Sequence, residues 1–249
     1  MAGVELSAQD TRRMNRVLRH RLRNFVSGVQ NSVKLLSSDL QGRLSSEELE
    51  YFPLIINECR EIDRLTQRMT YLFDEPAQGA DRRLSDILEH AKTTIREQLP
   101  TAQIEVQSGS PATDVRLHGS HLLLLALNEL LMNALEAKPN GRVEVACELA
   151  GDAVAVQVLD DGKGIPEAER PNAALPFHTT RSRHLGIGLS VAERMAWRLG
   201  GTLHLYPRLP KGWCAEIRVP AADDGLFGKP QPDAGIAGPD ERAARGRKN

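Results

Sequence analysis

Two long runs of regularly spaced apolar residues dominate the first third of the chain. The first run extends from Met14 to Leu40 and the second from Leu49 to Leu72. In both runs apolar residues recur at intervals of three and four, which places them on one face of an α-helix. A lone helical hairpin cannot bury both faces, whereas two copies paired by twofold symmetry can form a four-helix bundle. The pattern therefore predicts a hairpin that makes a homodimer.

The segment between the two runs carries the signals of a helix start. A Ser-Ser-Glu-Glu sequence at 45–48 supplies an N-cap hydroxyl and acidic residues for a first turn. Pro53 follows a short way into the second run. Since proline is unfavourable inside a helix, we expect either a kink at this point or a later true start of the second helix.

A third helix, predicted around residues 122–137, combines many leucines with amides and carboxylates. Polar groups inside such a helix cost free energy unless something binds them. Glu129 and Asn133 are four residues apart, so both project from one face. The carbonyl oxygen of Asn133 suits a hard cation such as Mg²⁺, which prefers oxygen ligands and usually accompanies phosphates. A polar face that simply meets water is the alternative, and this helix alone does not decide between the two.

A strand-like alternation at 154–159 ends in Asp160, which is followed by Gly162 and Gly164. A carboxylate at a strand end can accept a hydrogen bond from the exocyclic amine of adenine, whereas guanine has an acceptor at that position. Glycines allow the backbone to approach a flat base closely. The alternative interpretation is an ordinary Asp-Gly hairpin turn.

A second glycine pair, Gly186 and Gly188, opens a helical pattern that continues to Leu199. Glycine-rich loops that enter a helix N-terminus can hold phosphates on free backbone N–H groups. Alone, the pair is weak evidence, because a loop before an amphipathic helix can have the same sequence.

Taken together and in this order, the three motifs resemble the Bergerat-type (GHKL) ATPases, and within them the catalytic domain of sensor histidine kinases. The resemblance covers roughly residues 80–220. It implies that Asn133 is a ligand of Mg²⁺ and that Asp160 recognises the adenine of ATP. It also implies nucleotide-binding roles for six further residues: Gly162, Gly164, Ile165, Gly186, Gly188 and Leu189.

The segment 176–181 resembles the phenylalanine box of a short ATP lid in this family. The resemblance implies that Phe177 packs the lid, that Thr180 contributes to it and that Arg181 meets the γ-phosphate. His178 stands where many relatives carry a second phenylalanine.

The segment 18–24 of the first helix resembles the phosphoacceptor box of the same kinases, with His20 as acceptor. A neutral imidazole is a nucleophile near pH 7. Arg21 occupies the position where most relatives have an acidic residue, so we hypothesise that Glu129 or water acts as the base. Asn24, one turn after His20, would orient water to dephosphorylate a phospho-aspartyl partner. A surface histidine among arginines is the alternative for an isolated helix.

We therefore predict an α+β protein whose dimerising helical hairpin precedes an α/β sandwich of the GHKL ATPase type. The expected sandwich contains a helix at 84–95, short strands at 104–107 and 115–117, and two strand pairs, 143–149 with 153–159 and 202–206 with 215–219. The expected domains are the hairpin at 1–75, a linker at 76–80, the ATP-binding domain at 81–220 and a disordered tail at 221–249.

Composition is consistent with a cytoplasmic enzyme. The formal net charge of −1 implies no bulk attraction to nucleic acid or to anionic membranes. Cys59, Cys147 and Cys214 have neither disulfide nor metal-ligand spacing. We see no apolar stretch that could cross a bilayer.

The expected activity is autophosphorylation of His20 from Mg·ATP, followed by transfer to an aspartate of a response regulator. The alternatives are a non-catalytic histidine phosphotransferase adaptor of the same architecture, a GHKL ATPase or protein-serine kinase without histidine chemistry, and a purely structural coiled coil.

Overall fold

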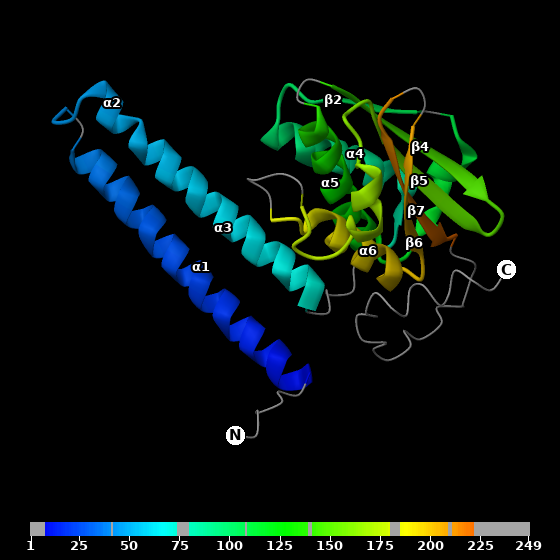
Figure 1. Ribbon diagram of the computed structural model, residues 1–249, viewed down its shortest axis with the longest axis horizontal. Coiled ribbons are helices and arrows are strands. Elements are labelled where there is room, and N and C mark those ends of the chain that lie inside the picture. Colours follow the sequence, from blue (N-terminus) through cyan, green and yellow to red (C-terminus); the bar gives the residue numbers. More distant parts are fainter. Residues whose placement is uncertain are drawn as a thin grey trace.

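The computed structural model describes residues 8–40, 42–73, 80–107, 109–138, 141–179, 185–208 and 211–221, with side chains from residue 13 onward. It consists of a long helical hairpin and an α+β domain (Figure 1). The predicted linker at 76–80, apart from its last residue, and the predicted tail after 221 lie outside the described residues. The predicted domain boundaries therefore stay predictions.

The hairpin is formed by α1 (Ala8–Asp39), α2 (Ser46–Leu49) and α3 (Tyr51–Phe73). Ser45 is the N-cap of α2, and its hydroxyl accepts a hydrogen bond from the backbone N–H of Glu48 at 3.3 Å. The Glu48 carboxylate in turn accepts from the Ser45 backbone N–H at 2.8 Å, which completes a capping box. Pro53 lies in the first turn of α3, where a missing N–H is tolerated, so the expectation of a later true start is confirmed.

The hairpin exposes a long apolar face. Val26 and Val33 of α1 are buried, but Phe25 is 71% exposed. The other exposed large apolar side chains of this hairpin are Met14, Val17, Leu18, Leu22, Val29, Leu35 and Leu36 of α1 and Tyr51, Leu54, Ile55 and Ile62 of α3. A contiguous apolar surface of this kind usually marks an interaction site. The four-helix bundle stays a prediction that this surface favours.

The domain is built on a mixed sheet of five strands in the order β2-β4-β5-β7-β6. Strand β2 runs parallel to β4, and all other neighbours are antiparallel. The strands are β2 (Gln103–Val106), β4 (Arg142–Ala150), β5 (Ala153–Asp160), β6 (Thr202–Pro207) and β7 (Trp213–Pro220), and a two-stranded sheet pairs β1 (Arg82–Arg83) with β3 (Arg116–Leu117). Two short 3-10 helices, η1 (Pro111–Asp114) and η2 (Glu167–Asn172), complete the domain.

Three helices, α4 (Leu84–Gln98), α5 (Ser120–Ala137) and α6 (Gly188–Arg198), cover one face of the five-stranded sheet (Figure 1). Alternate residues of β5, from Val154 to Val158, enter the same core as these helices. Helix α5 is the central element, because its leucines are buried on several sides. Burying each such side chain contributes about 2 kcal/mol to the hydrophobic stabilisation of the core. The predicted α+β fold is confirmed.

Helix α3 lies between α1 and the domain (Figure 1). Its C-terminal half packs against α6, and Leu65, Tyr71 and Leu72 contact the edge of the domain core. Within the described residues, no helix is both long and apolar enough to cross a membrane.

Candidate active site

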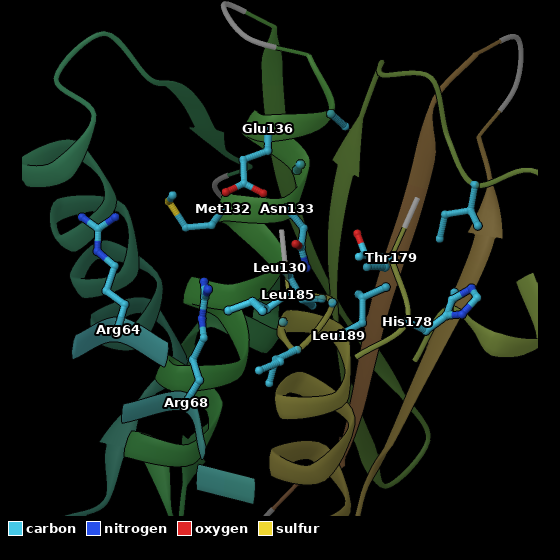
Figure 2. Close-up of a pocket in the computed structure, with 18 of the residues that line it drawn as sticks. Arg64, Arg68, Leu130, Met132, Asn133, Glu136, His178, Thr179, Leu185 and Leu189 are labelled. Carbon is cyan, nitrogen blue, oxygen red and sulfur yellow. The ribbon is translucent and has the colours of Figure 1, made fainter. Parts of the chain in front are cut away.

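A cleft of about 1490 Å³ lies between α3 and the α+β domain. One wall is α3, and the other comprises α5, the start of α6, the ends of β5 and β7, and the loop that follows β5. Figure 2 shows Arg64 and Arg68 on one side, His178 and Thr179 on the other, and Asn133 and Glu136 between them. Several predicted nucleotide-binding residues line this cleft: Asn133, Asp160, Gly164, Ile165, Gly186, Gly188 and Leu189.

Asn133 and Glu129 of α5 meet the first residue of α6. A Cβ atom placed on Gly188 would lie 3.0 Å from Asn133 Nδ2 and 3.0 Å from Glu129 Oε2. Asn133 Nδ2 and Glu129 Oε2 are buried, and neither has a hydrogen-bond partner in the described part of the chain. Unpartnered buried polar atoms are costly, so their convergence at a helix start indicates a binding site.

Glu129 is also tied to the hairpin. Its side chain accepts a hydrogen bond from Arg68 Nε to Oε1 at 2.8 Å, and the two groups form an ion pair. The residue is only 9% exposed. Burial raises the pKa of the Glu129 carboxyl above its ordinary value, although the Arg68 guanidinium acts in the opposite direction. Sequence reasoning missed Arg68, because a charged residue beside an apolar helical stripe is usually a solvated one.

Asp160 is the last residue of β5, and its side chain is buried at the cleft. Its Oδ1 accepts a hydrogen bond from the Gly162 backbone N–H at 2.7 Å. A Cβ on Gly162 would lie 2.7 Å from the Ala137 Cβ, so only glycine allows the loop to pass this close to α5. The turn after β5 therefore holds the Asp160 carboxylate in place.

The N-terminus of α6 opens into the cleft. Gly186, two residues before the helix, has a φ of +64°, and a side chain there would collide with the His178 backbone. The N-cap residue, Ile187, makes no side-chain cap hydrogen bond. The first-turn N–H groups of an uncapped helix favour anions such as phosphates.

These residues fit a nucleotide accompanied by a divalent cation. The amide oxygen of Asn133 and the unpartnered Glu129 oxygen are ligands of the kind that Mg²⁺ prefers. Both adjoin the start of α6, where N–H groups suit phosphates.

The expectation that Phe177 packs the lid stays a prediction. Its side chain is 59% exposed. Its φ is +64°, and its backbone N–H donates to the Gly186 carbonyl at 2.9 Å. His178, its neighbour, pairs through Nε2 with Glu169 Oε2 at 2.7 Å. The predicted lid residues Thr180 and Arg181 lie outside the described residues.

His20 and Asn24 lie on α1, exposed and one turn apart. Asn24 Nδ2 is 3.4 Å from His20 Nδ1. The structure does not bring this pair into the cleft, since α3 lies between α1 and the domain (Figure 1).

A model of the histidine kinase-, DNA gyrase B- and HSP90-like ATPases matches residues 119–223. These residues are thus similar to the ATPase domain of that family. The matched range includes α5, β5 and α6, which carry the residues that converge on the cleft.

The similarity to curated relatives covers more of this chain than the family model does. Sporulation kinase D of Bacillus subtilis is 25% identical over 209 residues, which are 82% of this chain and 40% of the relative. NtrY, a nitrogen regulation protein of Azorhizobium caulinodans, is 26% identical over 243 residues, 90% of this chain and 31% of NtrY. The sensory histidine kinase/phosphatase NtrB of Azospirillum brasilense is 24% identical over 250 residues, 93% of this chain and 61% of NtrB. The chain thus spans less than two thirds of the length of each of these three relatives.

Solved structures support the fold. Full-length ShkA in complex with AMPPNP superposes with a TM-score of 0.69 at 18% identity, over 86% of this chain and 47% of ShkA. The catalytic domain of the histidine kinase ThkA gives 0.52 at 22% identity, over 59% of this chain and 97% of that domain.

Proposed function

We propose that this chain autophosphorylates His20 from Mg·ATP and passes the phosphoryl group to an aspartate of a response regulator. The observation that carries the proposal is the convergence of Asn133, Asp160 and the α6 N-terminus on one cleft, in a chain whose hairpin exposes a histidine. The activity belongs to the cytoplasm, where ATP is available, and the two copies of the hairpin would pair through its exposed apolar face.

In this proposal the adenine amine donates to the Asp160 carboxylate, and the phosphates meet the N–H groups at the start of α6. Asn133 would hold Mg²⁺, which neutralises phosphate charge when bound. Arg64 and Arg68 face the cleft from α3 (Figure 2), where each is paired with a carboxylate, Arg64 with Glu61 and Arg68 with Glu129. Catalysis then rests mainly on positioning and charge neutralisation.

The transfer step forms a bond between a ring nitrogen of His20 and the γ-phosphorus and breaks the bond from that phosphorus to the β–γ bridging oxygen. ADP leaves, and a ring proton passes to a base. Asn24 adjoins Nδ1, which leaves Nε2 as the ring nitrogen away from that amide. Because α3 separates α1 from the cleft of its own chain, transfer requires the domain to move or the second copy of the dimer to supply the nucleotide.

Incubation with γ-labelled Mg·ATP, followed by acid or alkali treatment, tests the proposal. Phosphohistidine label is expected to be lost in acid and to survive in alkali. Acid-stable label would indicate a protein-serine kinase instead. Absence of both label and nucleotide binding would favour a non-catalytic phosphotransferase adaptor.

Glu129→Gln tests the base role proposed for Glu129. General-base catalysis contributes about 10² to 10⁴ in rate, so the variant is expected to label at least about 100-fold more slowly. Its affinity for ATP in EDTA, measured by calorimetry, should stay close to that of the wild type, since the glutamine can still accept from Arg68 and no metal is involved. Labelling at the wild-type rate would exclude Glu129 as the base. The ion pair between Glu129 and Arg68 would then have only a structural role.

Asn24→Ala tests the phosphatase role proposed for Asn24. The variant is expected to keep autokinase activity and to lose most dephosphorylation of its phosphorylated receiver partner, because the amide that orients water is gone. The measurement compares decay of phospho-receiver with each variant in the presence of ADP. Asn31→Ala, an exposed amide on the same helix, is the matched control. Equal decay rates for Asn24→Ala and wild type would remove Asn24 from this role.

A further inference from the structure

Trp213 forms part of the cleft beside the proposed adenine-reading carboxylate. It is the first residue of β7 and pairs in register with Asp160 of β5. Directly opposed residues on adjacent antiparallel strands project to the same face, with Cβ atoms about 5 Å apart. Both residues line the cleft, as does Gly164, where an added Cβ would lie 3.4 Å from the indole ring.

The indole N–H of Trp213 donates no hydrogen bond within the described residues. The residue is only 6% exposed, and its Nε1 is buried with no acceptor in the described ranges. A buried tryptophan N–H usually has a hydrogen-bond partner, because a buried donor without one loses its hydration and gains no hydrogen bond in exchange. Arg170 lies over the ring, with its guanidinium carbon 5.2 Å from the ring centroid, and thereby helps to fix the indole.

A carboxylate acceptor and an indole donor on directly opposed residues match the edges of adenine that carry the exocyclic amine. Adenine presents its exocyclic N–H beside a ring nitrogen acceptor, N1 on one side and N7 on the other. Guanine presents a carbonyl oxygen instead of the amine, and a donor at N1. The Asp160–Trp213 pair is therefore complementary to adenine at two adjacent positions.

We propose that Trp213 is a specificity-determining residue for the nucleobase, whose Nε1–H donates to the adenine ring nitrogen next to the amine that Asp160 accepts. This inference rests on the proposed function, because it assumes that the cleft binds ATP. In addition to the Asp160 carboxylate, which accepts a hydrogen bond, the site would then have a donor that contacts the base at a second position.

Calorimetry on the full chain tests the donor with ATP, 1-deaza-ATP and 7-deaza-ATP. Trp213→Phe keeps an aromatic ring but removes the N–H, and it is expected to weaken ATP binding about tenfold, the worth of one hydrogen bond near the upper end of its usual range. One of the two deaza analogues should bind the wild type about tenfold more weakly than ATP. The affinity of Trp213→Phe for that analogue should equal the affinity of the wild type for it, because the analogue and the variant each remove one partner of the same hydrogen bond.

Equal affinity of the wild type for ATP and both analogues would overturn the proposal. So would equal losses on Trp213→Phe for all three nucleotides. Trp197→Phe is the matched control, because Trp197 is 45% exposed and does not line the cleft; its ATP affinity should equal that of the wild type.

The same control variant gives an independent readout that does not require replacing Trp213. The chain has two tryptophans, so Trp197→Phe leaves Trp213 as the sole indole emitter. Its fluorescence is expected to change on nucleotide addition and to saturate at the calorimetric Kd. Binding by calorimetry with no change in emission would contradict the inference. If the wild type bound no nucleotide, the proposed function itself would fail, which distinguishes the two.

Discussion

Replacing His20 with glutamine is expected to abolish acid-labile labelling of the chain by γ-labelled ATP. Glutamine retains a polar side chain of similar reach that can still hydrogen-bond to Asn24, but its amide is not a nucleophile. Because His20 lies on exposed α1, apart from the cleft, the variant should fold and bind ATP as the wild type does. The expected result is therefore a loss of label without a loss of nucleotide affinity.

His90→Gln is the matched control for this variant. His90 is also an exposed helical histidine, located on α4 of the α+β domain, and it contacts Arg82 rather than the hairpin. It should label at the wild-type rate. Acid-labile label that persists in His20→Gln would show that another histidine is the acceptor. Since His20 is the one histidine in residues 1–75, the acceptor would then lie outside the hairpin.

Much of the secondary structure could be predicted because local physics determines it. The three-and-four spacing of apolar residues gives α1 and α3, and the Ser45–Glu48 capping box marks a helix start from side chains close in sequence. Sheet order is different, because it depends on distant packing. The parallel pairing of β2 with β4, and the position of β7 between β5 and β6, have no local signal in the chain.

The candidate site divides in a similar way. Asn133, Asp160 and the glycines could be identified because fixed residue types recur at fixed spacings in a known family. Arg68 and Trp213 could not, since each joins the cleft only through a contact between elements far apart in sequence: α3 with α5, and β7 with β5. The positive φ of Phe177 is likewise not revealed by a sequence pattern.

Asn133→Ala is expected to weaken binding of Mg·ATP on the order of 100-fold, because an interaction with a charged group is worth up to about 3 kcal/mol. The amide of Asn133 lies against the first residue of α6 and faces the cleft. The loss should be specific to the metal-bound nucleotide. We expect calorimetry to show a large effect of Asn133→Ala in Mg²⁺ and a much smaller one in EDTA, and autophosphorylation should fall in parallel.

Asn128→Ala provides the matched control on the same helix. Asn128 is five residues earlier, it does not line the cleft, and its buried Oδ1 has no hydrogen-bond partner in the described part of the chain. Removing it therefore leaves no new unpaired group and should leave Mg·ATP affinity unchanged. If Asn133→Ala bound Mg·ATP as tightly as the wild type, the Mg²⁺ ligand would have to be an oxygen of another residue. Glu129 Oε2, which adjoins the same helix start, is the neighbour that could then hold it.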